Sequence, residues 1–170
     1  MSSKIDDFRN FFKPNKKVES FNPNDVINNA IGLVELSFKS HDITIIKDLS
    51  VENLKVVGYP NEFLQVIINI LNNAKDEYLE LESTTDLNIM IKTKLEENKV
   101  IIEIEDSAGG IDKDIIEKVF DPYFTTKEEG KGTGIGLYMT KMIVENNMHG
   151  KVFVKNTNNG CIFTISLLSN

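Results

Sequence analysis

The chain has a single cysteine and no long apolar run, which argues against a disulfide framework and against membrane-spanning helices. Cys161 cannot form an internal disulfide, and its place in the apolar run CIFTISLL predicts a residue of the core. No apolar stretch approaches the roughly 20 residues that a membrane helix needs. No signal peptide precedes Lys4. We therefore expect a soluble, cytoplasmic chain without membrane contact.

Basic residues are also few, and they form no stripe along the sequence. Lysine and arginine number 19 against 26 acidic residues, which gives a formal net charge of −7. This balance disfavours nucleic acid as a partner, because binding to the phosphate backbone requires clustered cations. The chain has no internal repeat, and its 170 residues, 41% of them hydrophobic, can bury one ordinary core plus a short appendage.

The sequence is rich in glycine at one place, the segment GKGTGIGL at residues 130–137, where glycine recurs at every second position. Glycines let backbone N–H groups approach an anion closely, and the helical pattern that follows would add its N-terminal N–H groups. The segment lacks the Gly-Lys-Ser/Thr ending of a P-loop, and no short strand leads into it as in a Rossmann fingerprint. It therefore predicts a different kind of phosphate site.

Residues 61–81 (NEFLQVIINILNNAKDEYLEL) have the apolar spacing of a helix with one buried side. Asn69 and Asn73 lie four residues apart on one face, although asparagine is a poor interior helix residue. Two interpretations are open. The asparagines are polar residues at the helix margin, or a carboxamide oxygen is offered to a hard cation such as Mg²⁺.

A predicted strand at residues 100–106 (VIIEIED) ends in Asp106, directly before the small-residue turn Ser-Ala-Gly-Gly. A carboxylate in this place could accept a hydrogen bond from an exocyclic amine such as adenine N6, while the small residues let a flat ring approach the backbone. The alternative is an aspartate that caps the turn.

Taken in order, these segments resemble the ATP-binding catalytic domain of sensor histidine kinases, in the superfamily that includes DNA gyrase, Hsp90 and MutL. The helix resembles the N box through Gln65, Asn69, Asn72, Asn73 and Ala74. The segment DSAGGI at residues 106–111 resembles the first glycine box, FDPYFTTK at 120–127 the F box, and GKGTGIGL the second glycine box. With the flanks, the resemblance covers almost the whole chain.

The resemblance implies roles for particular residues. Asn73 matches the Mg²⁺ ligand, Asp106 the adenine-reading aspartate, and Asn69 a position that supports the metal and phosphates. Gyrase-like branches carry at that position a glutamate that activates water, so Asn69 favours phosphoryl transfer over hydrolysis. Ala108 stands where the first glycine of its box usually lies, and because alanine adds only one methyl we expect binding to survive.

The resemblance also implies a nucleotide lid at residues 112–131, with Lys127 and Lys131 as the candidate phosphate cations. Asp76 replaces a common lysine or arginine, and NAKDE with the TTK ending is similar to the nitrogen-regulatory variant. The implied catalytic residues are Asn69, Asn73 and Lys127. The implied ATP-binding residues are Asn69, Asn73, Asp76, Asp106, Gly110, Ile111, Phe120, Thr126, Lys127, Lys131, Gly132, Thr133, Gly134, Gly136 and Leu137.

The fold expected is α+β, a two-layer sandwich with a mixed, mainly antiparallel sheet and three helices on one face. The segments we expect to be helical are residues 23–38, capped by Asn22, then 61–81 and 134–147. The expected strands are 43–47, 54–57, a hairpin of 87–95 with 99–106, and a second hairpin of 151–156 with 161–168.

Neither histidine suits a phosphoacceptor. His41 lacks the following proline of the family and lies in a predicted helix-to-strand connection, and His149 precedes Gly150 at a predicted helix end. We therefore expect a fragment, with residues 1–17 the end of a dimerisation and phosphoacceptor domain and residues 18–170 the catalytic domain. The parent would be a homodimer that uses Mg-ATP to phosphorylate its own histidine and then a response regulator. The alternatives are a non-catalytic, nucleotide-responsive interaction domain, or a gyrase- or Hsp90-like ATPase.

Overall fold

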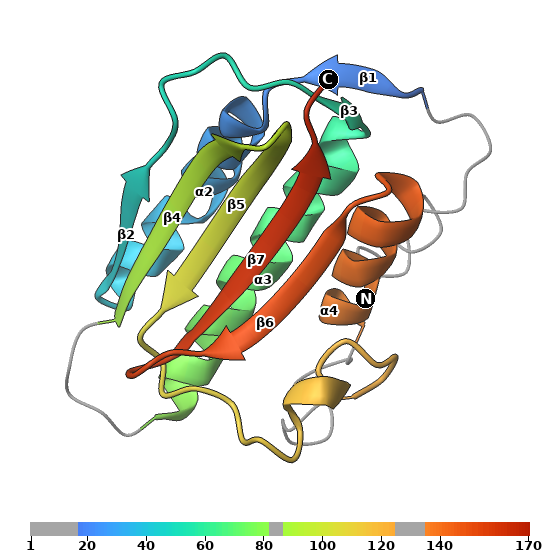
Figure 1. Cartoon of the computed structure of the whole chain (residues 1–170). Coiled ribbons are helices and arrows are strands. Elements are labelled where there is room, and N and C mark those ends of the chain that lie inside the picture. Colours follow the sequence, from blue (N-terminus) through green and yellow to red (C-terminus); the bar gives the residue numbers. More distant parts are fainter. Residues whose placement is uncertain (1–16, 82–86, 125–134) are drawn as a thin grey trace.

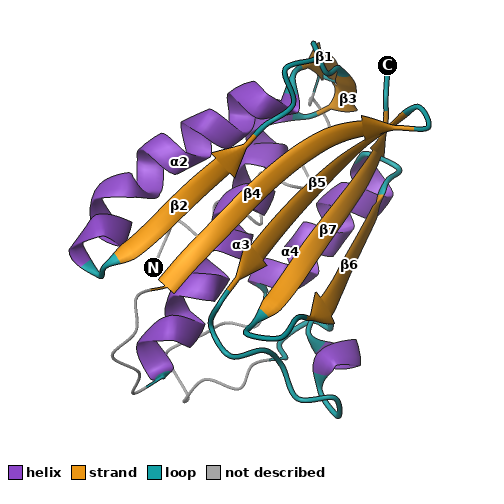
Figure 2. Ribbon diagram, turned by 60° about the vertical axis from the view of Figure 1, so that its left-hand side comes forward, coloured by secondary structure: helices purple, strands orange, loops and turns teal. Residues whose placement is uncertain are grey.

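The computed structural model describes residues 17–81, 87–124 and 135–170. In this part of the chain a five-stranded sheet is covered on one face by helices α2, α3 and α4, which makes a two-layer sandwich (Figures 1 and 2). None of the helices there is long and apolar enough to cross a membrane. The architecture is the α+β sandwich that the sequence predicts.

The sheet is mixed and mainly antiparallel, in the order β2-β4-β5-β7-β6. β2 is parallel to β4, and every other neighbouring pair is antiparallel. The strands are β2 (Ile43–Asp48), β4 (Leu87–Glu96), β5 (Lys99–Asp106), β6 (Lys151–Asn156) and β7 (Cys161–Leu168). All five match predicted strands to within a residue at each end.

The β4–β5 hairpin turns where the sequence predicts it. Glu97 and Asn98 are its two loop residues, and both have positive φ, 49° and 63°. Two successive residues with positive φ are the signature of a type I′ turn, whose twist matches that of the paired strands. The register that follows pairs Ile91 with Ile104. Strand alternation then sets one apolar face of β4 and β5 against the helices.

The core lies between that sheet face and helices α2 (Pro23–Ser40) and α3 (Pro60–Glu80). Asn22 caps α2 as predicted, its side-chain Oδ1 accepting a hydrogen bond from the N–H of Asn24 at 2.8 Å. The fully buried side chains include Ile67, Ile70 and Leu71 of α3. Each such side chain contributes about 1.5–3 kcal/mol by leaving water, so this packing fixes α3 firmly against the sheet.

The last predicted helix is present, but its second half is not α-helical. α4 (Gly136–Lys141) continues as a π-helical segment, η2 (Met142–Asn147), in which the N–H of Met148 donates to the carbonyl of Ile143 five residues earlier. A π-turn absorbs an extra residue. Here the wider turn leaves Ile143, Val144 and Met148 all buried, which an apolar periodicity alone did not reveal.

The predicted strand at residues 54–57 does not join the main sheet. The observed β3 (Val56–Gly58) instead pairs antiparallel with β1 (Glu19–Phe21), a strand that the sequence analysis did not predict. Both segments are short, so neither shows a clear alternation. Tertiary contacts hold these segments in place. The ring of Phe21 lies 5.8 Å from that of Phe63, and the N–H of Asn170 donates to the carbonyl of Lys55.

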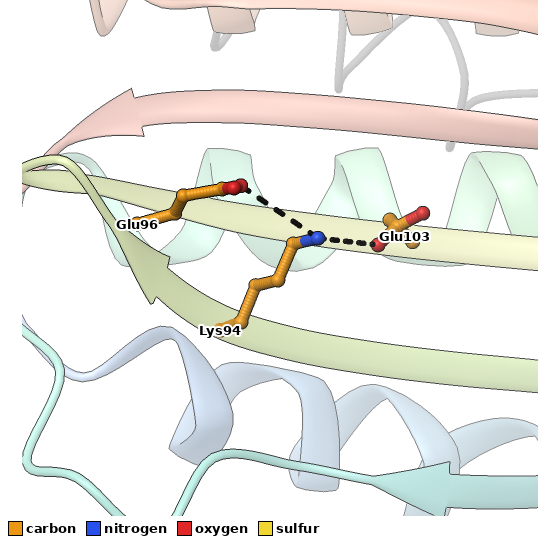
Figure 3. Close-up of polar contacts among 3 residues, drawn as sticks. All are labelled: Lys94, Glu96 and Glu103. Atoms are coloured by element: carbon orange, nitrogen blue, oxygen red, sulfur yellow. Dashed lines mark ion pairs between the residues drawn. The ribbon is translucent and has the colours of Figure 1, made fainter.

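The other face of the sheet is open to solvent and carries charged side chains. Lys94 of β4 lies 3.6 Å from Glu103 of β5 and 3.6 Å from Glu96 on its own strand (Figure 3). Exposed ion pairs of this kind contribute little stability, roughly 0–1 kcal/mol. The face of the sheet that packs against the helices therefore contributes most of its stability.

Both histidines occupy connections, as the sequence predicts. His41 ends α2, where its backbone N–H donates to carbonyls of the last turn and its Nδ1 lies 2.8 Å from the carbonyl oxygen of Ser37. His149 follows η2 with φ of 57°, immediately before Gly150.

A short 3-10 turn, η1 (Ile116–Lys118), interrupts the loop after β5.

Gly160, directly before β7, should not tolerate a side chain. A Cβ there would overlap the carbonyl oxygen of Asp106 and would lie 2.7 Å from its Oδ1. Since backbone must then shift, we expect Gly160→Ala to lower the free energy of unfolding by about 2 kcal/mol or more in urea denaturation.

Gly32 provides the matched control, because a Cβ on this α2 residue meets nothing within 4 Å. Gly32→Ala should raise stability by about 0.5–1 kcal/mol through helix propensity. Equal, small effects of the two substitutions would contradict the close approach at Gly160.

Candidate functional site

Asp106 is a buried carboxylate at the end of β5, with 6% of the residue exposed. Its Oδ1 accepts hydrogen bonds from the N–H groups of Ala108, at 2.9 Å, and Cys161, at 3.4 Å. Its Oδ2 accepts from the Cys161 thiol at 3.2 Å. A thiol is a weak donor, so Oδ2 keeps acceptor capacity for a stronger one.

The turn after Asp106 takes its shape from two glycines. Gly109 and Gly110 have positive φ, 96° and 79°, a conformation that side chains resist. Ala108 is not among the residues with positive φ, and its N–H bonds to Asp106. The alanine that replaces the usual glycine is therefore compatible with the turn.

Asn156, at the end of β6, holds this turn from the other side. Its Oδ1 accepts from the N–H of Ile111 at 2.7 Å, and its Nδ2 donates to the carbonyl of the same residue at 2.6 Å. The N–H of Gly109 also donates to the carbonyl of Asn159, at 2.9 Å. Neither asparagine is predicted from the sequence to belong to the site, because each lies some fifty residues beyond the turn and carries only an ordinary loop signal.

Helix α3 borders the site along its length. Near its C-terminus, Leu81 lies beside Gly109, where an added Cβ would be 3.6 Å from each leucine methyl carbon. One turn earlier, the charge of Glu77 contributes to raising the pKa of the Cys161 thiol. Toward the middle, Asn69 Nδ2 donates to the carbonyl of Gly136 at 3.1 Å. The helix thus joins the Asp106 turn to the start of α4.

Asn73 lies on α3 between Asn69, which contacts Gly136, and Leu81, which lies beside Gly109. It is one helical turn, about 6 Å along the axis, beyond Asn69. It is half-buried, and no other residue of the described ranges forms a hydrogen bond with its carboxamide. Those ranges hold no cluster of three or more histidine, cysteine or acidic side chains that would cage a metal. A single carboxamide oxygen suits Mg²⁺ that keeps its waters and binds phosphates, so Asn73 fits the role that the resemblance implies.

The remaining predicted residues that the structure describes lie around this region. Ile111 and Leu137 are half-buried and pack against the core, and Asp76 is half-buried on α3. The Phe120 ring packs edge-on against Phe163, with centroids 6.1 Å apart. Phe120 therefore anchors the loop after β5 to strand β7. Six predicted residues lie outside the described residues: Thr126, Lys127, Lys131, Gly132, Thr133 and Gly134.

The Cys161 thiol should be inert in the folded chain. Burial raises its pKa well above the usual range, and the neighbouring carboxylate of Asp106 raises it further. Because the thiolate is the reactive form, we expect no labelling by a disulfide reagent at pH 8 until urea unfolds the chain. Stoichiometric labelling within minutes under native conditions would contradict this environment.

A protein-family model described as histidine kinase-, DNA gyrase B- and HSP90-like ATPase matches residues 58–170. The two-component sensor PprA of Pseudomonas aeruginosa is 32% identical over 149 residues, which are 86% of this chain and 16% of that protein. The sensor histidine kinase ZraS of Salmonella typhimurium is 33% identical over 153 residues, 88% of this chain and 31% of that protein. The chain therefore spans less than a third of either relative.

Solved structures agree with these matches. The nucleotide-free catalytic domain of the histidine kinase ThkA superposes with a TM-score of 0.77 at 29% identity, covering 89% of this chain and 97% of that one. The family model covers more than half of the sequence and includes α3, Asp106 and the glycine segments. The chain belongs to the family of histidine kinase-, DNA gyrase B- and HSP90-like ATPases.

Proposed function

We propose that this chain is the catalytic module of a sensor histidine kinase, which binds Mg-ATP and transfers its γ-phosphoryl group to a histidine on a separate phosphoacceptor domain. The observation that carries the proposal is the presence, along one helix-bordered site, of a buried carboxylate, Asp106, and of a carboxamide, Asn73, to which no described residue forms a hydrogen bond. The similarity to sensor kinases supports the choice of reaction.

Asp106 is the adenine-reading group in this proposal. Its Oδ2 is engaged in the described residues only by the Cys161 thiol, so it can accept a hydrogen bond from an exocyclic amine. Gly109 and Gly110 keep side chains away from the turn beside it. Guanine presents a carbonyl oxygen where adenine presents its amine, and that oxygen would face the carboxylate unfavourably.

Asn73 would hold Mg²⁺ through its carboxamide oxygen. The bound metal supplies positive charge that neutralises the phosphates during transfer. Lys127 remains the predicted phosphate cation and Lys131 a second one. The glycines of residues 130–137 remain the predicted phosphate contacts.

In the transfer itself, an imidazole nitrogen of the acceptor attacks the γ-phosphorus, and the bond from that phosphorus to the bridging oxygen of ADP breaks. The imidazole N–H proton is lost to solvent. At the position where an ATPase of this superfamily has a water-activating glutamate, this chain has Asn69, whose amide is already bonded to Gln65 and Gly136. That arrangement offers no carboxylate for hydrolysis.

The proposal extends to the setting of the reaction. The parent would act as a homodimer in the cytoplasm, with the histidine donated by a dimerisation domain and the phosphoryl group passed on to a response regulator. The decisive experiment mixes this chain with Mg-ATP and a cognate histidine domain and looks for an acid-labile phosphoprotein. Absence of that product, with ATP bound, would favour a nucleotide-responsive interaction domain instead.

Asn73→Ala should abolish Mg²⁺-dependent transfer, because the metal loses its protein ligand, while the circular dichroism of the free chain stays unchanged. Transfer to the histidine domain is followed with radiolabelled ATP. Asn61→Ala, at an exposed position on the same helix, is the control and should leave the rate unaltered. A near wild-type rate in Asn73→Ala would assign the metal elsewhere.

Asp106→Asn should weaken ATP binding by about 1–3 kcal/mol, since it removes a buried, charged hydrogen-bond acceptor. Calorimetry on the wild type should also show GTP binding much more weakly than ATP. Equal affinities for ATP and GTP would contradict the adenine role of Asp106.

A further inference from the structure

Side-chain hydrogen bonds connect Gln65 and Asn69 of α3 with Gly136 and Thr140 of α4. Gln65 Nε2 donates to Asn69 Oδ1 at 2.8 Å, and Asn69 Nδ2 donates to the carbonyl of Gly136 at 3.1 Å. Thr140, which is fully buried, donates its hydroxyl to the same carbonyl at 3.0 Å. Two donors from different helices therefore converge on one backbone oxygen.

The orientation of both amides follows from that oxygen. A backbone carbonyl can only accept, so the nitrogen end of the Asn69 carboxamide must face Gly136. Its oxygen end then faces Gln65, which must present its own nitrogen as donor. The direction of the two hydrogen bonds is therefore fixed at one end by the Gly136 carbonyl. Gln65 supports that direction at the other end.

This polarity makes the two asparagines of α3 chemically different. The oxygen of Asn69 is occupied by the donor from Gln65, whereas no described residue bonds to the carboxamide of Asn73. The contact with Gly136 also fixes the start of α4, which lies within the glycine segment at residues 130–137. A Cβ added to Gly136 would be in ordinary van der Waals contact with Asn69, 3.8 Å from its Cγ.

We propose that Gln65 is a positioning residue of the nucleotide site: it holds Asn69 as a donor that fastens the start of α4 to α3, and so leaves Asn73 as the metal-facing carboxamide. The inference rests on the proposed function for its role toward ATP. The hydrogen bonds from Gln65 to Asn69 and from Asn69 to Gly136, here called the clamp, are present in the chain without nucleotide.

Gln65→Glu tests the polarity with almost no change in size. A glutamate is ionised at pH 7 and can only accept. Asn69 must then turn its nitrogen toward residue 65, which sets its oxygen against the Gly136 carbonyl and breaks the clamp. Gln65→Ala removes the support without imposing the wrong orientation, so its effect should be smaller. A residue that only fills space would show the opposite order.

The first measurement is amide hydrogen exchange in the first turn of α4, at Met139 and Thr140, without nucleotide. We expect exchange about two- to tenfold faster in Gln65→Glu, the range for loss of one hydrogen bond, and a smaller increase in Gln65→Ala. Asn61→Asp adds the same charge at an exposed site one turn earlier on α3 and should leave exchange unchanged.

The second measurement is ATP affinity with and without Mg²⁺. Gln65→Glu should weaken binding about tenfold in both conditions, the effect expected of roughly one lost hydrogen bond, while Asn73→Ala should remove the Mg²⁺ dependence. The proposal is overturned if Gln65→Glu behaves like wild type while Gln65→Ala is impaired. It is also overturned if Asn69→Ala removes the Mg²⁺ dependence as Asn73→Ala does. Failure of the wild type to bind ATP would instead overturn the proposed function, and the exchange data would still decide the clamp.

Discussion

The burial of the Asp106 carboxylate constrains the elements around it. A carboxylate withdrawn from water is costly unless donors satisfy it, and here the donors come from the next turn and from the start of β7. The turn must fold back to bring the Ala108 N–H to Oδ1, which puts Gly109 and Gly110 at positive φ. β7 must approach closely, which leaves no room for a side chain at Gly160.

Helix α3 connects this buried group to the rest of the site. One side of the helix is core, with Ile67, Ile70 and Leu71 almost fully buried, and this packing holds the helix against the sheet. The neighbouring side carries Asn69 and Asn73. Because the helix is held by its apolar face, its polar residues have fixed positions before any ligand binds. In the proposed function, preorganisation of this kind would lower the entropic cost of positioning phosphates.

The loop after β5 is held differently. In residues 107–124, the described part of this loop, the turn η1 is the regular structure present, and the contacts include those of backbone groups with Asn156 and Asn159 and that of the Phe120 ring with Phe163. These contacts tie one wall of the site to the β6–β7 turn. The site is thus built from one rigid helix and one loop that is fastened at separate points.

Much of the fold could be predicted because its signals are local. Apolar periodicity located α2, α3 and the five strands of the main sheet, and turn chemistry placed the β4–β5 hairpin. Prediction failed where local signals are short or ambiguous. β1 and β3 are three residues each and depend on distant partners, and η2 is only six residues long, so its wider π-turn does not show in the apolar pattern that predicts a helix.

The sequence by itself determined which residues we propose as the carriers of the chemistry: the asparagines of α3, the aspartate that ends β5 and the glycines beside it, since each is identified by its neighbours along the chain. Only the tertiary structure decided how they are held. Asn69 meets Gly136 across 67 residues and Asn156 meets Ile111 across 45, distances over which spacing carries no signal. The polarity of the Gln65–Asn69 pair was likewise invisible in the sequence, because an amide can face either way until a carbonyl oxygen, brought by folding, allows only one.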